Sequence, residues 1–274
     1  MARAGPSQAK LDALMSHYSL GRYPEAEAAA RHLVRKWPRL GVAWKALGAV
    51  LAAQRRIDEA VPALQKSLAL TPSDSETHNA LGNSLQALGR TAEAAASYRR
   101  ALKHAPHSYE TLTNLGNVLK DLGQGSDAIA SYARALELKP DYHEAHSNLG
   151  VVLKALGRFA EAEAGFRRAV ELRPGYAEAH NNLGSVLVDL CRPSEAEQRF
   201  RRALELRPDY PLAHNNLMFV LNYHPDLPAE EIFAAYRAFD ERFGRPLRSA
   251  WCAHANERQP SRRLRVGYVS PDFR

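Results

Sequence analysis

Residues 75–108 read SETHNALGNSLQALGRTAEAAASYRRALKHAPHS, and residues 109–142 read YETLTNLGNVLKDLGQGSDAIASYARALELKPDY. The two stretches share, in register, a Leu-Gly pair, a second glycine, a tyrosine and a proline. The same 34-residue period runs on in both directions, with prolines at Pro38, Pro72, Pro106, Pro140, Pro174 and Pro208. A fixed period of this kind indicates one supersecondary unit stacked on copies of itself.

The unit has the pattern of a helical hairpin. Apolar residues at three- and four-residue spacing predict a first helix over 76–88. Gly89 can adopt the left-handed conformation that ends helices, and Thr91 is suited to cap a second helix over about 92–103. Pro106 then stops that helix, because proline lacks an N–H donor.

Small residues predict where the two helices cross. Gly82 and Ala94 stand at that point, and Tyr98 should fill the space beside them. One such hairpin cannot bury its apolar face alone, so it needs neighbours on both sides. The sequence therefore predicts a stack of hairpins.

This pattern resembles the tetratricopeptide repeat, which implies an all-α solenoid, a right-handed superhelix of helical hairpins. By register the repeats run 7–40, 41–74, 75–108, 109–142, 143–176 and 177–210. A partial seventh extends the repeat region to 7–223. The first repeat is degenerate, with Leu14 in place of the glycine, and Met218 replaces it in the last.

Composition indicates a cytoplasmic chain that does not enter a membrane. The 274 residues are 45% hydrophobic, and no stretch reaches the 18 to 20 consecutive apolar residues of a membrane span. Two cysteines, Cys191 and Cys252, are too few for a disulfide framework. The first residues, MARAGPSQAK, contain no apolar run that could serve as a signal peptide.

A net charge of +7 raises the question of nucleic acid. Arginines recur at one place on the second helix of the unit: Arg99, Arg100, Arg134, Arg167, Arg168, Arg201 and Arg202. This place is expected on the outer surface, and no aromatic residue is interleaved for base stacking. The pattern favours a solvated face over an anionic partner, and no nucleic acid is expected.

Histidines form another column, at His78, His146, His180 and His214. Equivalent positions in stacked helical repeats lie about 10 Å apart, too far to share one metal ion. We therefore expect these histidines to be packing residues with a polar edge, and no metal site.

An asparagine column is more informative for function. Asn114, Asn148, Asn182 and Asn216 each stand two residues before the glycine position. This side of the first helix is expected on the inner, concave surface. An asparagine amide offers a donor and an acceptor that match the N–H and C=O of an extended peptide. The column therefore predicts a groove that holds a peptide by its backbone.

Further asparagines should be neighbours in the same groove: Asn79, Asn83, Asn117, Asn181 and Asn215. For the column at Asn114, Asn148, Asn182 and Asn216 the alternative is structural, since an asparagine at that position can also bond within its own hairpin.

After the repeats, the chain changes character. Residues 224–244 predict a helical transition segment opened by Pro228, and 245–262 form a Pro- and Arg-rich linker. Residues 263–274 read RLRVGYVSPDFR, in which 264–269 alternate polar and apolar residues as a strand does before a turn.

This succession resembles the junction between repeats and catalytic domain in O-linked N-acetylglucosamine transferases and their bacterial and SPINDLY-like relatives. The resemblance implies that 263–274 begin an α/β glycosyltransferase domain using UDP-N-acetylglucosamine, or a fucose donor as in some relatives. The catalytic histidine of the family lies beyond the DFR motif. No catalytic residue or cofactor site is therefore assigned here, and these 274 residues alone should be inactive.

Two functions of different class follow. The chain is either the substrate-recognition arm of a protein glycosyltransferase, binding extended protein segments, or a stand-alone protein-interaction scaffold. A clamp for C-terminal carboxylates is not expected, since Lys45 is accompanied by Ala49, and Glu144 and Asn148 replace the later basic residues. The sequence leaves open whether the repeats also self-associate.

Overall fold

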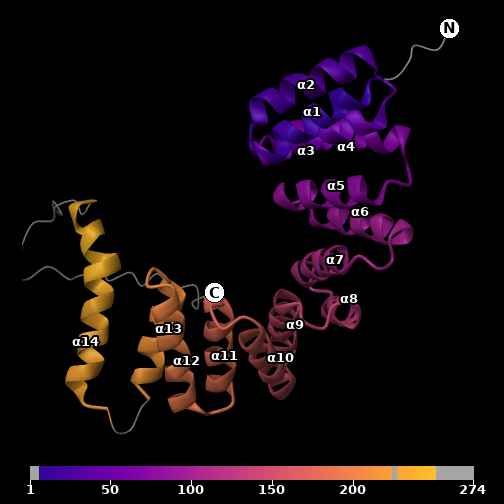
Figure 1. The fold of residues 1–274 in the computed structure, drawn as a ribbon. Coiled ribbons are helices and arrows are strands. Elements are labelled where there is room, and N and C mark those ends of the chain that lie inside the picture. The colour runs from indigo at the N-terminus through magenta and orange to yellow at the C-terminus, as the bar shows by residue number, and fades with distance from the viewer. Residues whose placement is uncertain (1–5, 224–226, 251–274) are drawn as a thin grey trace, which may run out of the picture. The chain divides into compact units, whose positions relative to one another are not determined.

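The computed structural model describes residues 6–223 and 227–250, and every regular element among them is a helix (Figure 1). The described residues belong to two units, divided at Pro225 and Asp226. The helices of the first unit are α1 (Gln8–Ser19), α2 (Tyr23–Lys36), α3 (Gly41–Ala53), α4 (Ile57–Leu70), α5 (Ser75–Ala87), α6 (Thr91–His104), α7 (Tyr109–Asp121), α8 (Gly125–Leu138), α9 (His143–Ala155), α10 (Phe159–Leu172), α11 (Ala177–Asp189), α12 (Pro193–Leu206) and α13 (Pro211–Leu221).

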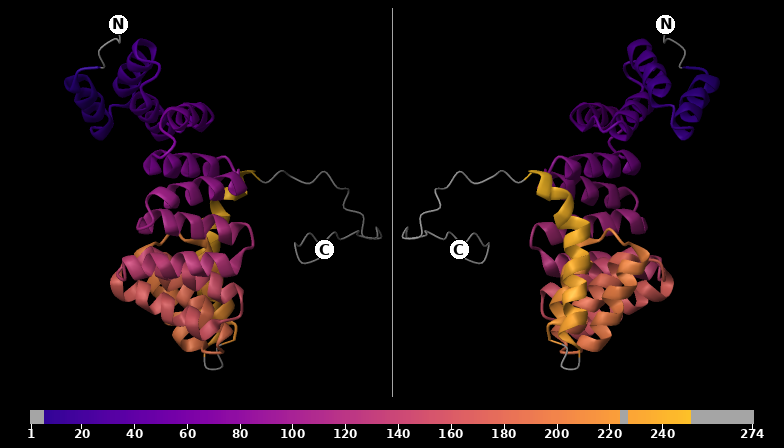
Figure 2. Two further views of the ribbon diagram at one scale, coloured as in Figure 1. Left: turned by 90° about the vertical axis from the view of Figure 1, so that its right-hand side faces the viewer. Right: turned by 90° about the vertical axis from the view of Figure 1, so that its left-hand side faces the viewer.

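The helices repeat with the period of the sequence. From α3 onward, the first helix of each hairpin begins 34 residues after the one before it, at Gly41, Ser75, Tyr109, His143, Ala177 and Pro211. Each helix packs on the next one along the chain, so the hairpins follow one another in order (Figure 2). This arrangement confirms the expected all-α solenoid of helical hairpins.

The turn inside each hairpin requires a left-handed residue. Gly89 has φ +72° and lies in the turn that ends α5, as its sequence position predicts. Gly21, Gly123 and Gly157 do the same in their own hairpins. In two hairpins a non-glycine residue is held in this conformation: Arg55 at φ 62° and Cys191 at φ 57°.

The two helices of a hairpin cross at the predicted glycine. A Cβ atom added to Gly82 would lie 2.5 Å from Cε1 of Tyr98, whose side chain is fully buried. Ala94 is fully buried too. The other glycine crossings pair Gly48 with Leu64, Gly116 with Tyr132, Gly150 with Phe166 and Gly184 with Phe200. Close approach of the backbones is therefore what the periodic glycine provides.

The start of the second helix differs from expectation. Thr91 is the first residue of α6 and makes no capping bond, so the assignment of Thr91 as a cap is wrong. Arg90 holds the N-cap position instead, because its N–H bonds back to the Leu85 carbonyl at 2.9 Å to close the glycine turn. The Arg90 guanidinium pairs with Glu93 at 2.7 Å. The negative charge of Glu93 is itself favoured in the first turn of a helix.

The outer arginines are mostly paired along their own helices. Arg167 bonds to Glu163 at 2.8 Å, and Arg201 to Glu197 at 2.7 Å. Burial disfavours the charge of Glu163, but hydrogen bonds from Arg167 and Arg192 outweigh it and lower the pKa of this carboxyl. These pairs explain much of the Arg and Glu content on the second helices.

The histidine column closes the connections between hairpins. Nε2 of His78 lies 2.9 Å from the carbonyl oxygen of Pro72, six residues earlier. Three other histidines repeat this contact with the preceding proline: His146, His180 and His214. At the same position Trp44 bonds to the Pro38 carbonyl at 2.9 Å. An indole N–H can only donate, so we assign Nε2–H as the donor in the histidines as well.

The second unit contains α14 (Ala229–Phe239), continued by a π-helical turn over Asp240–Gly244 and a 3₁₀ helix over Arg245–Ala250. Helix α14 begins after Pro228, as the sequence predicts, and none of its residues is buried. The linker expected from residue 245 thus starts in helical form. The expected strand at 264–269 lies outside the described residues.

Candidate functional site

The first helices of successive hairpins form a continuous row. Helix α5 contacts α3 and α7 in addition to its own second helix, and the same holds from α7 to α13 along the chain. The predicted asparagines stand on these first helices. The row therefore brings side chains from consecutive repeats within reach of one another.

The asparagines form hydrogen bonds between repeats. Nδ2 of Asn148 donates to Oδ1 of Asn117 in the preceding repeat at 3.0 Å. Nδ2 of Asn114 reaches Oδ1 of Asn83 at 3.2 Å and of Asn79 at 3.4 Å. We call these contacts, together with the bond from Asn216 Nδ2 to Asn181 Oδ1 at 3.0 Å, the asparagine ladder.

The ladder is itself a structural role, but it differs from the bonds within one hairpin that the sequence offered as the alternative. The bonds join neighbouring repeats and do not stay within one hairpin, since the paired residues are 31 or 35 positions apart. A bond across repeats fixes the register of one hairpin on the next. It also fixes the orientation of the donating amide.

Tyrosine hydroxyls hold the acceptor ends of the ladder. Tyr98 donates to Oδ1 of Asn83 at 2.7 Å, and Tyr132 to Oδ1 of Asn117 at 2.6 Å. Burial raises the pKa of both phenols, so they remain protonated donors at neutral pH. Each of these oxygens therefore receives one bond from its own hairpin and one from the next.

Sequence reasoning missed this role of the tyrosines. It treated the residue at the crossing as a space-filling group only. A signal was present: the repeats with Tyr98 and Tyr132 carry asparagine directly after the glycine, whereas those with Phe166 and Phe200 carry Val151 and Ser185 there. The hydroxyl and its acceptor thus occur together.

Three predicted residues are placed differently from the rest. Asn182 makes no side-chain hydrogen bond within the described residues, because Val151 occupies the position that Asn117 has one repeat earlier. Asn215 is exposed. Asn181 is only 1% exposed, so it lies between helices as a ladder acceptor, away from any groove surface.

The ladder leaves binding capacity unused. Asn114, Asn148 and Asn216 are each half-buried, and each uses only its Nδ2 group in the ladder. An amide nitrogen carries two N–H groups and the oxygen two lone pairs. Asn148 and Asn216 make one ladder bond each, so each keeps a donor and an acceptor for a further partner. Asn114 directs its nitrogen at two acceptors and keeps only its oxygen.

An apolar cavity of about 200 Å³ lies on the first helices of the N-terminal repeats. Leu14, Met15 and Val42 contribute to its lining, and Met15 is 57% exposed. Lys45 stands at its edge but is bound to Asp74 at 3.1 Å and to Glu76. The charge of Lys45 is thus paired within the protein.

A second cavity, of about 260 Å³, lies at the C-terminal end of the ladder. Helices α11 and α13 line it with Asp189, Asn215, Asn216 and the half-exposed ring of Phe219. Nearby, Lys154 of α9 donates to Ser185 at 2.8 Å and pairs with Asp189 at 3.1 Å. This end of the row offers both polar and aromatic contacts.

Known proteins account for the repeat architecture. The tetratricopeptide repeat model matches residues 39–110 and 141–209, and a second model of the same repeat matches 116–157. The chain belongs to the tetratricopeptide repeat family. A comparison with curated proteins finds no match.

Solved tetratricopeptide repeat structures share the fold. YrrB, described as a tetratricopeptide repeat protein with an unusual peptide-binding site, is 24% identical with TM-score 0.58, over 68% of this chain and 96% of its own. PilF of Pseudomonas aeruginosa is 19% identical with TM-score 0.65, over 76% of this chain and 91% of its own. A chain of the APC/C hetero-tetramer Cut9–Hcn1 is similar at TM-score 0.65 and 20% identity, over 77% of this chain and 42% of that one.

Within 6–223 and 227–250, no helix combines the length and the apolar character needed to cross a membrane.

Proposed function

We propose that the row of first helices binds extended protein segments, with the asparagine ladder holding the peptide backbone. The observation that carries this proposal is the unused acceptor on Asn114, Asn148 and Asn216, with an unused donor on Asn148 and Asn216, all oriented in advance by the ladder. Amides that are already ordered lose little conformational entropy when a ligand binds. The chain then acts as a binding scaffold.

The spacing of the repeats suits an extended chain. Neighbouring helices pack about 10 Å apart, and an extended peptide advances about 3.3 Å per residue. One asparagine per repeat therefore meets roughly every third residue of the peptide. The apolar cavity beside Met15 and the cavity beside Phe219 would receive side chains at the two ends. The peptide-binding site described for YrrB gives this proposal a precedent on the same fold.

A finer proposal concerns the reaction that this binding serves. We infer that the repeats are the substrate-recognition arm of a cytoplasmic protein O-GlcNAc transferase, delivering serine or threonine to a catalytic domain that uses UDP-N-acetylglucosamine. The support is the resemblance of 263–274, RLRVGYVSPDFR, to the first catalytic strand of those enzymes, and its place after the repeats. A scaffold without a transferase is the alternative.

Peptide binding is tested by calorimetry with an unstructured, Ser/Thr-containing peptide of about 12 residues, long enough to cross four repeats. Replacing Asn114, Asn148 and Asn182 by alanine should weaken binding on the order of 100-fold, at about 1 kcal/mol for each lost contact. The matched control replaces Arg134, Arg168 and Arg202 on the second helices of the same three repeats, and should bind as the wild type.

A single variant separates binding from structure. Asn182 stands at the same register position as Asn148 but makes no ladder bond, so its amide is available to a peptide. Thermal unfolding of Asn182→Ala should therefore match the wild type while its peptide affinity falls. Equal affinity of the wild type, Asn182→Ala and the threefold asparagine variant would refute the peptide-binding role.

The transferase role is tested with the product of the gene read past Arg274, incubated with labelled UDP-N-acetylglucosamine and the same peptide. We expect transfer to serine or threonine, with the asparagine variant raising KM and the arginine control leaving it unchanged. An inert product that still binds the peptide would leave the scaffold function and exclude this transferase function.

A further inference from the structure

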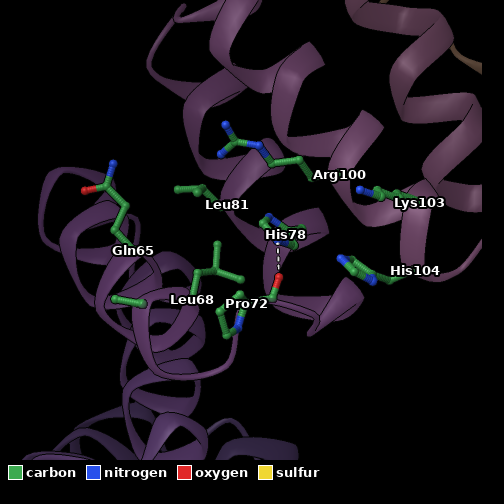
Figure 3. Close-up of a pocket in the computed structure, with 9 residues that line it drawn as sticks. Gln65, Leu68, Pro72, His78, Leu81, Arg100, Lys103 and His104 are labelled. Carbon is green, nitrogen blue, oxygen red and sulfur yellow. Dashed lines mark hydrogen bonds between the residues drawn. The ribbon is translucent and has the colours of Figure 1, made fainter.

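An open cavity of about 540 Å³ lies between the second and third repeats, on the side of the second helices (Figure 3). Helices α4 and α6 contribute most of its lining, and α5 contributes His78 and Leu81. Its lining residues are Gln65, Leu68, Ala69, Pro72, His78, Leu81, Arg100, Lys103 and His104. None of them belongs to the asparagine ladder.

The polar lining of this cavity is basic. Arg100, Lys103 and His104 come from the last turns of α6, and the lining contains no carboxylate. Within the part of the chain that the structure describes, neither Arg100 nor Lys103 forms an ion pair. Two cations one turn apart on a helix repel each other by a few tenths of a kcal/mol. The cluster thus carries positive charge that the protein itself leaves unbalanced.

In each of the three following repeats, a glutamate balances the charge of the arginine at the position of Arg100. The residues equivalent to Arg100 pair with a glutamate one turn later: Arg134 with Glu137 at 2.5 Å, Arg168 with Glu171 at 3.1 Å and Arg202 with Glu205 at 2.7 Å. In the third repeat Lys103 replaces that glutamate, and His104 replaces the leucine that follows it in the others.

The helix dipole does not explain this difference. Lys103 and His104 stand in the last turn of α6, where positive charge is favoured by about 0.3–1 kcal/mol. The equivalent turns of α8, α10 and α12 contain no basic residue. The dipole also does not explain why Arg100 lacks the glutamate partner of its equivalents. A negatively charged ligand would give Arg100 a partner.

A rigid base supports the cluster. His78 is 6% exposed, and its Nε2 is fixed to the Pro72 carbonyl at 2.9 Å. The ring of His104 lies nearly parallel to it, at 10° and with 6.2 Å between ring centres. Figure 3 shows Arg100, Lys103 and His104 around His78, with Leu68 and Leu81 on the apolar side.

We propose that this cavity binds a compact oxyanion carried by a partner protein: the phosphate of a phosphorylated side chain or a side-chain carboxylate. The Arg100 guanidinium offers a planar fork of donors that suits either group, and the Lys103 ammonium adds a point charge. His104 offers at least one ring N–H. Leu68 and Leu81 would contact the apolar stem of the ligand side chain.

The test uses the whole chain and three probes: inorganic phosphate, a phosphoserine peptide and the same peptide with glutamate in place of phosphoserine. Binding is followed by calorimetry and by the NMR signals of His78 and His104. The variant Lys103→Glu/His104→Leu recreates the sequence found in the three following repeats, so it should fold normally. We expect it to bind each probe that the wild type binds at least tenfold more weakly.

A graft provides the converse. In the fifth repeat His146 and Arg168 match His78 and Arg100, while Glu137 of the fourth repeat stands where Ala69 lines the cavity. Glu137→Ala/Glu171→Lys/Leu172→His should therefore create a second site and raise the binding stoichiometry to about two, as equivalent repeats act independently. Preference for the phosphoserine peptide identifies phosphate as the source of the oxyanion, and preference for the glutamate peptide identifies carboxylate. No binding of any probe, equal binding by Lys103→Glu/His104→Leu, or an inert graft would overturn the proposal.

Discussion

At the scale of single residues, each position that recurs in the repeats has its own structural role. Strain occurs where a repeat has a different residue at such a position. Four hairpin turns use glycine at positive φ, while Arg55 and Cys191 adopt the same conformation with a side chain. A left-handed residue other than glycine costs roughly 1–2 kcal/mol, because its Cβ approaches the following carbonyl oxygen. These two turns are therefore places where the fold imposes a conformation against the preference of the residue.

We expect Arg55→Gly to raise the free energy of unfolding by about 0.5–1 kcal/mol, the relief of strain exceeding the added flexibility of the unfolded chain. Arg55 is exposed, so packing does not change. Urea unfolding followed by circular dichroism measures the effect. The matched control is Gly89→Ala, which places a side chain at φ +72° and should lower stability. A loss of stability in Arg55→Gly would show that the turn does not store this strain.

Residue-scale roles differ in how far the sequence reveals them. The turn glycines follow from their spacing alone. The hydrogen bond from Nε2 of His180 to Pro174 does not, because it depends on where the proline carbonyl of the connection points. Burial lowers the pKa of His180, which a sequence column cannot express either. Hydrogen bonds and pKa shifts that depend on the direction and burial of a group can be assigned only from the folded hairpin.

At the scale of the element, the crossing of two helices is decided by volume. Gly82 lies against the Tyr98 ring, and an added Cβ would overlap it. The phenol cannot retreat easily, because its hydroxyl is bound to Asn83. The packing of one hairpin and the asparagine ladder are thus linked through the same tyrosine.

We expect Gly82→Ala to destabilise the chain by about 1–3 kcal/mol, the usual cost of overpacking a core. Gly175→Ala is the control, since a Cβ there meets nothing within 4 Å and the change should stay within about 0.5 kcal/mol. Thermal unfolding of both variants gives the comparison. Equal stability of the two would mean that the crossing tolerates a methyl group.

Hairpin boundaries were largely predictable because proline and glycine act locally. The expected first helix at 76–88 is observed as Ser75–Ala87, and the second, at about 92–103, as Thr91–His104. The capping error at Thr91 arose because the glycine turn extends by one residue through the bond from Arg90 to Leu85. Residue propensities do not describe the backbone geometry of the turn, on which this bond depends.

At the scale of the whole molecule, the repeats are coupled by contacts only between neighbours. The asparagine ladder adds directed bonds to that packing, and Lys154 adds another between α9 and α11. The sequence predicted the asparagine column, since its register is fixed by the period. It could not predict which members bond to one another, because this depends on residues a repeat away, such as Val151 opposite Asn182.

The same dependence on neighbours explains why the basic cavity was not predicted. The recurring arginines of the second helices predict a solvated surface when they are considered from the sequence alone. Most of these arginines do pair with a glutamate. Comparison of Lys103 with Glu137, Glu171 and Glu205 on the built helices separates the third repeat from the three repeats that follow it.

The central claim is that the ladder asparagines hold a peptide by its backbone, and an N-methyl scan tests it most directly. Each residue of a bound peptide of about 12 residues is N-methylated in turn, which removes one backbone N–H and leaves the side chain unchanged. The account predicts that affinity falls at about every third residue, in step with the repeats, by roughly three- to tenfold at each such position. A profile that is flat, or that follows side-chain identity instead, would contradict it.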